Sequence, residues 1–279
     1  MWLNPISVIP SEARNLSYAF IRGRRKRIVL TLILPPLVCA ISANAQEPVP
    51  LARGNAPGEP HHHLKIENEY VRVYYVEVPP HENTQLHQHD HDYIYVSLGP
   101  ADVVSAILNQ PEIHLQLKDG ETHFTRGGFA HVARNLADTP FRNITIELLR
   151  PQGKLHNWCD NVVPDEEFDC RTRTIQGRTL RPSFRTDSIK EFEETLNPKV
   201  FSTWEVYSDA LIVVLTDSQL QVSFDKKKQE LDAEQVYWIS SLPRLEMRKI
   251  TLKNQRKGNS RYLVILFEGY APENKSSIN

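Results

Sequence analysis

The sequence predicts an all-β protein in which two similar β-rich regions follow one another. From residue 64 to residue 270, short runs of alternating or β-branched residues recur at close intervals, each bounded by Pro, Gly, Asn or Asp. The 19 prolines, the 11 glycines and the many Val, Ile, Tyr and Thr residues favour strands and turns. No helical period is sustained through residues 64–150. Many short strands separated by turn signals are typical of a β-sandwich or a β-barrel.

The two regions have similar strand patterns. The first contains YVRVYYVEV, DYIYVSLG, VVSAIL, IHLQL, HVARNL and RNITIELL, and the second contains VFSTWEVYS, ALIVVLT, LQVSF, VYWIS, LEMRKITL and YLVILFEG. HDYIYVSLGPADV matches SDALIVVLTDSQL in its apolar positions, and RNITIELL matches RYLVILFE. These matches indicate an ancient duplication, and chance agreement between two generic β-patterns is the alternative.

Residues 1–45 are predicted to be a secretory signal peptide. A basic cluster, residues 22–27, precedes the apolar run IVLTLILPPLVCAIS, and the small residues ANA follow, so cleavage is expected near Ala45. The apolar run is short for a membrane span and two prolines interrupt it, which makes an uncleaved anchor the weaker interpretation. We therefore expect a periplasmic or secreted protein that has no membrane contact after cleavage.

Cleavage at this point would leave an acidic protein. Of the 33 basic and 34 acidic residues, six basic and one acidic lie in residues 1–45, so 27 and 33 remain and the net charge becomes −6. This charge argues against nucleic acid and against anionic membrane surfaces as partners. The expected partner is a small-molecule ligand or substrate, and assembly into a homo-oligomer stays open.

Three segments without a sustained strand pattern separate the remaining parts of the chain. Residues 46–63 are rich in proline and glycine and are predicted to be a linker, residues 151–185 are polar and connect the two regions, and residues 271–279 form a tail. Cys159 and Cys170 lie in the connecting segment, and in an exported protein such a pair predicts a disulfide that closes a short loop. Two free thiols are the alternative if the protein is not exported.

Three histidines alternate with polar residues in LHQHDHDYIYVSLG, residues 86–99. Because a strand sends alternate side chains to opposite faces, His87 and His89 point the same way, and both imidazoles can reach one cation. The stretch GGFAHVARN offers His131 from another strand, after paired glycines that permit tight backbone geometry. A polar strand end that happens to be rich in histidine is the alternative.

The second region offers no comparable cluster. All 11 histidines lie at or before His156, and the positions equivalent to the alternating histidines hold Trp204, Val206 and Ser208. If the first region carries a metal site, the second region is a scaffold copy that cannot repeat it.

The two histidine-containing stretches together resemble the two sequence motifs of the cupin family. In the first motif, His87-Gln88-His89 match the HxH opening, and Gly99 lies one residue early. The second motif is matched by Gly120, Gly128, His131 and Asn135, with Arg126 where proline is usual. The resemblance implies two antiparallel β-barrels of the jelly-roll type: a metal-binding cupin domain at residues 64–150 and a degenerate cupin domain at residues 186–270.

The resemblance also implies a ligand set, from which one member is missing. His87, His89 and His131 match the three histidine ligands of the family, but the position of the glutamate ligand falls on Tyr93. Asp92 could restore a carboxylate if the strand register shifts, and His91 has the same parity as the two matched histidines. Tyr93 lying near the metal without binding it is preferred over either of these as a ligand. Donation of a hydrogen bond to a ligand on the metal and a place as a core aromatic are equally weighted roles for Tyr93. Arg126 is a candidate contact for an anionic substrate, and a surface ion pair is its alternative.

A site of this kind can serve several functions. A divalent ion held by three neutral imidazoles keeps its full charge and has open positions, and Fe, Zn, Mn, Ni and Cu all fit such a ligand set. We expect an exported metal-binding cupin protein that acts on a small molecule as a metal-dependent dioxygenase, or as a Lewis-acid isomerase or lyase. The alternative is a non-catalytic ligand-binding or scaffold cupin, which the missing glutamate and the second region favour.

Overall fold

The structure, a computed structural model, describes residues 54–159, 170–240 and 247–268. The predicted signal peptide and the C-terminal tail lie outside these ranges. Nearly all of the described residues with regular structure are in strands, which confirms the predicted all-β class. Within the described part of the chain, no helix is long and apolar enough to span a membrane.

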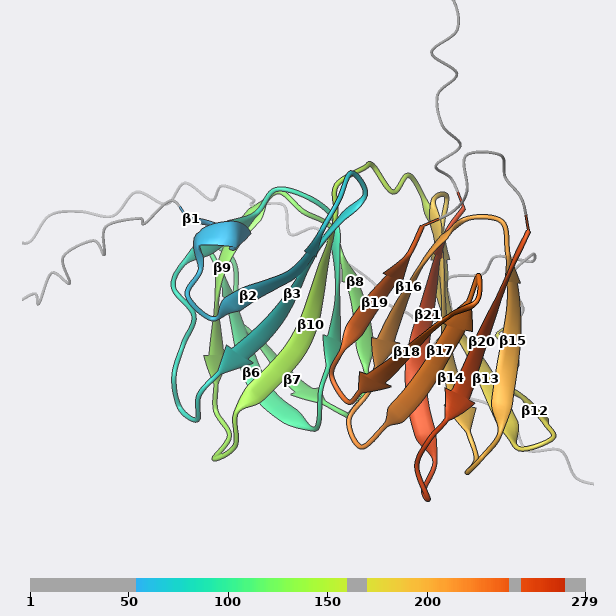
Figure 1. The fold of residues 1–279 in the computed structure, drawn as a ribbon. Coiled ribbons are helices and arrows are strands. Elements are labelled where there is room, and N and C mark those ends of the chain that lie inside the picture. The colour runs from blue at the N-terminus through green and yellow to red at the C-terminus, as the bar shows by residue number, and fades with distance from the viewer. Residues whose placement is uncertain (1–53, 160–169, 241–246, 269–279) are drawn as a thin grey trace, which may run out of the picture. The chain divides into compact units, whose positions relative to one another are not determined.

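The first ten strands form two five-stranded sheets of one jelly-roll barrel, in blue to green in Figure 1. One sheet has the order β1-β4-β9-β6-β7 and the other has the order β2-β3-β10-β5-β8. The elements are β1 (Gly54–Asn55), a 3-10 turn η1 (Ala56–Gly58), β2 (His62–Glu67), β3 (Val71–Val78), β4 (His87–His89), β5 (Tyr93–Ser97), β6 (Ala101–Ile107), β7 (Ile113–Leu117), β8 (Thr122–Thr125), β9 (Phe129–Asn135) and β10 (Phe141–Leu148).

The remaining strands form the second barrel, in yellow to red in Figure 1. One sheet has the order β11-β13-β14-β21-β16-β19, with β12 also paired to β13, and the other has the order β15-β20-β17-β18. The strands are β11 (Leu155–Trp158), β12 (Arg173–Ile175), β13 (Arg178–Thr186), β14 (Ile189–Leu196), β15 (Phe201–Val206), β16 (Asp209–Val214), β17 (Gln219–Phe224), β18 (Lys227–Asp232), β19 (Val236–Ile239), β20 (Arg248–Asn254) and β21 (Ser260–Phe267).

Strand pairing shows that the two barrels follow one plan. β10 pairs with β3 and β5, and β5 pairs with β8, just as β21 pairs with β14 and β16, and β16 with β19. A buried asparagine ends the equivalent strands β9 and β20, and each donates from Nδ2 to the carbonyl four residues later: Asn135 to Thr139 and Asn254 to Gly258. This agreement in pairing and in side-chain role supports the predicted duplication.

The strand register then aligns the histidines with their counterparts. His131 lies four residues before the first asparagine and Ile250 lies four residues before the second, so these two residues occupy equivalent positions. Their partners on the neighbouring strands, His87 and Trp204, are then equivalent as well. His89 accordingly corresponds to Val206, as the sequence predicts. In the second barrel all three positions therefore hold apolar side chains.

The interiors of the two barrels differ in the same way. Thirteen buried apolar residues fill the second barrel, among them Leu196, Ile212, Val222 and Val264. The apolar cluster inside the first barrel is smaller, with members such as Val76, Leu117 and Phe141, and the histidines lie beyond it. Burial of these apolar residues stabilises the second barrel, whereas the first barrel keeps space for a ligand.

Apolar faces of the two barrels pack against each other. Ile94, Val96, Ile144 and Ile146 of the first barrel belong to one buried cluster with residues of the second, such as Ile265. In β5 and β10 these residues alternate with the inward-facing residues, so each strand serves the interface with one face and the barrel interior with the other.

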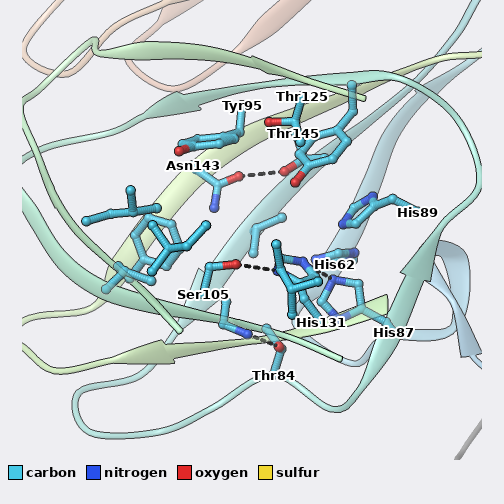
Figure 2. A pocket seen from close by; sticks show the side chains of 18 of the residues that line it. His62, Thr84, His87, His89, Tyr95, Ser105, Thr125, His131, Asn143 and Thr145 are labelled. Atoms are coloured by element: carbon cyan, nitrogen blue, oxygen red, sulfur yellow. Dashed lines mark hydrogen bonds between the residues drawn. The ribbon is translucent and has the colours of Figure 1, made fainter. Parts of the chain in front are cut away.

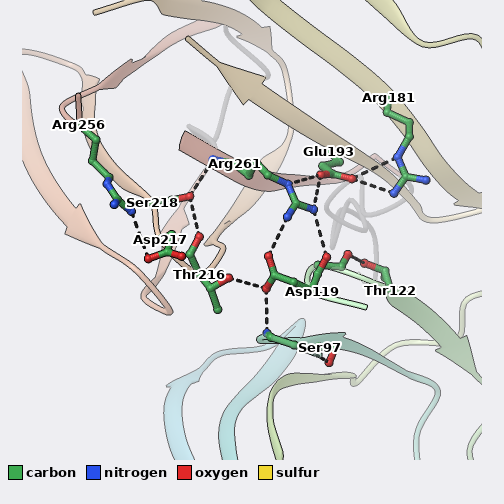
Figure 3. A network of polar contacts seen from close by, with 12 residues as sticks. Ser97, Asp119, Thr122, Arg181, Glu193, Thr216, Asp217, Ser218, Arg256 and Arg261 are labelled. Atoms are coloured by element: carbon green, nitrogen blue, oxygen red, sulfur yellow. Dashed lines mark hydrogen bonds and ion pairs between the residues drawn. The ribbon is translucent and has the colours of Figure 1, made fainter. Parts of the chain in front are cut away.

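A polar network at the edge of this interface ties the barrels together, as Figure 3 shows. Arg261 donates from Nη1 to Asp119 at 2.7 Å and from Nε to Glu193 at 2.9 Å. Gly120 has a φ of 75°, and a Cβ at this residue would lie 2.6 Å from Nη2 of Arg261. Glycine is required here because a side chain would suffer both an unfavourable backbone conformation and a clash with the bridging guanidinium.

Two segments differ from their predicted roles. Residues 54–63, predicted to be part of a linker, contain β1, η1 and the start of β2 and belong to the first barrel. Most of the described connecting segment 151–185 forms β11, β12 and β13 of the second barrel. Their Pro, Gly and polar composition obscured these strands, because strand pairing depends on backbone hydrogen bonds more than on side chains. Cys159 and Cys170 form the predicted disulfide.

One buried carboxyl group makes stability depend on pH. Glu191 on β14 is fully buried, and desolvation raises its pKa from 4.5 to about 8. A raised folded-state pKa stabilises the fold below the unfolded value of about 4.5, and this contribution is lost as pH rises through about 8. We expect Glu191→Gln to remove this loss. In urea unfolding, the free energy of unfolding of the variant should therefore rise relative to that of the wild type between pH 5 and pH 9. Parallel pH profiles for the two proteins would contradict this assignment.

Candidate metal centre

The alternation of β4 places His87 and His89 on the inner face of the first barrel. Each side chain is buried, with 2% of the residue exposed, while Gln88 between them is exposed to solvent. This is the arrangement predicted from the spacing of the two histidines, since successive strand residues point to opposite faces.

The third histidine comes from the neighbouring strand. β4 pairs antiparallel with β9 so that His131 lies directly opposite His87, and their Nε2 atoms are 3.1 Å apart. Nitrogens of His87, His89 and His131 all lie within 4.8 Å of one another (Figure 2). The turn before β9 is tight, because a Cβ on Gly127 would lie 2.4 Å from the carbonyl carbon of His91. The three imidazoles that the sequence brings together as candidates thus form one cluster.

Hydrogen bonds fix two of the rings with Nε2 directed toward the cluster. Nδ1 of His87 donates to the carbonyl of Gln85 at 2.8 Å, and Nδ1 of His131 lies 3.0 Å from Oγ of Ser105. A neutral imidazole that donates from Nδ1 has an unprotonated Nε2, which is the form that binds a metal ion. Desolvation lowers the pKa of His87 to about 4 and that of His131 well below its usual value, so both rings are neutral at pH 7.

These residues fit a divalent transition-metal ion. Two imidazole nitrogens that bind one ion at about 2.1 Å stand roughly 3.0–3.4 Å apart for right-angled or tetrahedral geometry. The 3.1 Å separation between Nε2 of His87 and Nε2 of His131 lies in that range. Without a cation, this contact is a hydrogen bond in which one Nε2 donates to the other, and a bound ion would take the place of that proton.

A cavity of about 180 Å³ adjoins the histidines (Figure 2). For comparison, a cavity of about 150 Å³ in another protein accommodates benzene. Apart from the histidines, its lining residues are apolar or uncharged: Val76, Thr84, Tyr93, Tyr95, Val103, Ser105, Ile107, Ile113, Leu115, Leu117, Thr125, Phe129, Ala133, Phe141, Asn143 and Thr145. Among the described residues, no Lys, Arg, Asp or Glu lines it.

Solved structures that share this fold include three proteins of different origin. AerE from Microcystis aeruginosa is 12% identical with a TM-score of 0.52, covering 75% of this chain and 98% of that one. Oxalate decarboxylase from Bacillus subtilis is 10% identical with a TM-score of 0.51, covering 72% of this chain and 69% of that one. Salicylate 1,2-dioxygenase from Pseudoaminobacter salicylatoxidans, solved as adducts with gentisate, is 10% identical with a TM-score of 0.50, again covering 72% and 69%.

These neighbours are cupin proteins, and oxalate decarboxylase is a double cupin. The chain has a double cupin fold. No family profile matches the sequence, and no curated protein matches it. The predicted fold class is therefore confirmed, and at these identities the comparison shows the fold alone.

The other predicted site residues of this cupin barrel occupy different places. Tyr93 lines the cavity, and its ring stacks on His89 with the ring centres 4.2 Å apart. Asp92 binds Nη1 of Arg126 at 2.7 Å and the backbone N–H of Gly127 at 3.1 Å, so its carboxylate is engaged away from the histidines. His91 is neither in the histidine cluster nor among the cavity-lining residues.

The structure places Arg126 outside the cavity of the cupin barrel. Its side chain is 52% exposed, and it donates to Asp92 and to the carbonyl of Gly153. Arg126 therefore forms a surface ion pair, which was its alternative interpretation. The turn before β9 directs its side chain toward the connecting segment.

His62 is a site residue that the sequence interpretation missed. It was assigned to the linker, but it lies on β2, lines the cavity and packs edge-on against His87 with the ring centres 4.8 Å apart. Its Nδ1 bonds the carbonyl of Ala56 at 3.0 Å, and desolvation lowers its pKa to about 3. The alternation in HHLKIE was the available signal, but the proline-rich residues before it concealed the strand.

Proposed function

We propose that this chain is a metal-dependent enzyme, an oxygenase, that acts on a small organic molecule with an apolar body. The observation that carries this proposal is a cavity in which three convergent imidazoles meet walls without charged residues. Fe, Mn, Zn, Ni and Cu remain candidates for the ion that His87, His89 and His131 would hold. A bound ion of this kind supplies Lewis acidity and, where it is redox-active, a centre for reaction with dioxygen.

The protein residues around the cavity support a substrate with one polar end. Asn143 accepts a hydrogen bond from Thr145 at 2.7 Å, which leaves its amide NH2 group free to donate to a ligand (Figure 2). The apolar residues around it exclude water from the rest of the substrate, and a body of about one ring fits the 180 Å³ volume. A second charged group on the substrate would have no partner in this lining, which disfavours a dicarboxylate such as oxalate.

Export is part of the proposal. A signal peptide at residues 1–45 would direct the chain to the periplasm or out of the cell, and the Cys159–Cys170 disulfide supports an oxidising compartment. We propose that the mature chain works there with a small-molecule partner and without nucleic acid.

Dioxygen uptake tests the enzymatic function. The chain is loaded separately with Fe2+, Mn2+ and Zn2+ and given gentisate, salicylate or oxalate, with an oxygen electrode as the readout. We expect metal-dependent uptake with a ring-containing compound and none with oxalate. Binding of gentisate or salicylate without turnover under every metal would support a second function, a ligand-binding cupin, which the absence of a glutamate at Tyr93 favours. Uptake with oxalate as the preferred substrate would contradict the assigned substrate class.

A further inference from the structure

Glu147 is an inward-facing carboxylate beside the metal centre. Along β10, Phe141, Asn143 and Thr145 line the cavity, and Glu147 is the next residue on the same face. It is 2% exposed and comes from the interior of the strand run RNITIELL, not from either motif. A buried carboxylate requires a compensating partner, so its surroundings should explain its position.

Glu147 lies directly across the sheet from the residue that replaces the expected glutamate. The register of β10 and β5 pairs Glu147 with Tyr93, and side chains opposite each other share one face. Tyr93 occupies the position at which the cupin motif places its carboxylate. In this chain, a carboxylate is therefore present one strand away from the expected position.

The nearest imidazole to Glu147 is the one that lacks a hydrogen-bond partner. Oε1 of Glu147 is 3.5 Å from Nδ1 of His89, slightly beyond hydrogen-bond length. Among the described residues, Nδ1 of His89 and Oε2 of Glu147 are both buried without a hydrogen bond. His87 and His131 have their Nδ1 atoms next to Gln85 and Ser105, so a contact with Glu147 would complete the same pattern for the third ring.

The second barrel loses this carboxylate together with the histidines. Glu147 follows Asn135 by 12 residues, and the residue at that distance after Asn254 is Leu266. His89 corresponds to Val206, so in the second barrel apolar residues replace both the histidine and the carboxylate. The asparagine, which only closes a turn, is present in both barrels.

Among the described residues, Arg72 also places a charge near Glu147. Its Nη1 is 3.8 Å from Oε2, but its Nε donates to Glu67 at 2.6 Å at the protein surface. Arg72 therefore approaches the oxygen that faces away from the His89 contact, and it has a closer partner of its own.

We propose that Glu147 is a positioning residue of the metal centre. It accepts a hydrogen bond from Nδ1–H of His89, which directs Nε2 toward the ion, and it supplies the negative charge that three neutral imidazoles lack. This inference rests on the proposed metal site and assigns to Glu147 an outer role, not direct coordination, since its oxygens are not within the three-nitrogen cluster.

Cobalt titration of two variants tests this role. Glu147→Gln keeps the acceptor oxygen and removes the charge, whereas Glu147→Leu, the residue of the second barrel, removes both. We expect Co2+ affinity to fall roughly 10–100-fold in Glu147→Gln, and further in Glu147→Leu. The visible absorption band of the bound Co2+ should shift as well. Glu191→Gln, which alters a buried carboxyl group on β14 of the second barrel, is the matched control and should leave affinity and spectrum unchanged.

The outcomes separate this inference from the proposed function. Wild-type affinity and an unshifted spectrum in Glu147→Gln would overturn the role of Glu147 while leaving the metal site intact. Equal losses in Glu147→Gln and in Arg72→Gln would also overturn it, because they would indicate a structural ion pair. Absence of Co2+ binding by the wild-type chain would instead overturn the metal site itself. Thermal unfolding of each metal-free variant identifies any loss of Co2+ affinity that is caused by misfolding. If the leucine variant does not fold, the isosteric glutamine variant alone tests the role of Glu147.

Discussion

His131→Ala is expected to lower the affinity for a divalent transition metal by more than about 100-fold, because loss of a ligand costs more than loss of an outer partner. The substitution removes one of the three nitrogens that lie within 4.8 Å of one another. It also separates the site from β9, leaving only the two histidines of β4. Isothermal titration with Zn2+ or Co2+ measures the effect directly.

His114→Ala provides the matched control for that substitution. His114 lies on β7 of the same barrel, its side chain is 53% exposed, and its ring is paired with Asp102 at the surface. Its removal should leave metal affinity unchanged. If both alanine variants bound metal as tightly as the wild type, the cluster would not be the binding site.

Glu194→Ala is expected to destabilise the protein by roughly 3 kcal/mol, because the buried carboxylate is the shared acceptor of several donors and the partner of the half-buried Arg178. Glu194 lies inside the second barrel with its side chain fully buried and paired with Arg178. Its Oε2 accepts hydrogen bonds from Ser202 at 2.8 Å and from the indole of Trp204 at 2.9 Å, and also from Tyr262. The alanine variant removes the acceptor of all three donors, and only Ser202 and Tyr262 can still bond to each other.

A surface pair of the same barrel supplies the comparison. Glu205 pairs with Lys249 at 3.2 Å, and the two side chains are 56% and 63% exposed. Glu205→Ala should change the free energy of unfolding by less than about 1 kcal/mol. Urea unfolding of both variants measures the difference, and a Glu194→Ala loss as small as that of Glu205→Ala would refute the structural role of this cluster.

The second barrel illustrates how a scaffold differs from a site. Trp204 occupies the position of His87, and its indole N–H is satisfied by Glu194. In the first barrel, Nδ1 of His89 and Oε2 of Glu147 have no such partner within the described residues. At these positions the second barrel satisfies its indole N–H internally, whereas the first barrel leaves two buried polar atoms that a bound ion would explain.

The fold and the two-histidine strand could be predicted from sequence because both depend on local alternation. HxH on a strand fixes the common direction of His87 and His89, and the family motif supplied His131 from a distant segment. Tyr93 was also correctly placed beside the histidines, since it follows them by a few residues on the next strand.

The missed residues depend on pairing between distant strands. His62 follows a proline-rich stretch whose edge-strand pairing has no local signal, and Glu147 acquires its meaning only through its register with Tyr93. Arg126 was selected because it lies close to His131 in sequence, but the turn between them reverses its direction. Proximity along the chain did not determine which side chains face the cavity.

Elemental mass spectrometry of the purified chain tests the central claim most directly. His61→Ala and His63→Ala are introduced first, to remove adventitious binding by the two histidines on either side of His62. The account predicts about one equivalent of a transition metal per chain, which is lost when His87 or His131 is also replaced by alanine. A chain that holds no transition metal, even after incubation with Fe2+, Mn2+, Ni2+, Cu2+ or Zn2+, would contradict it.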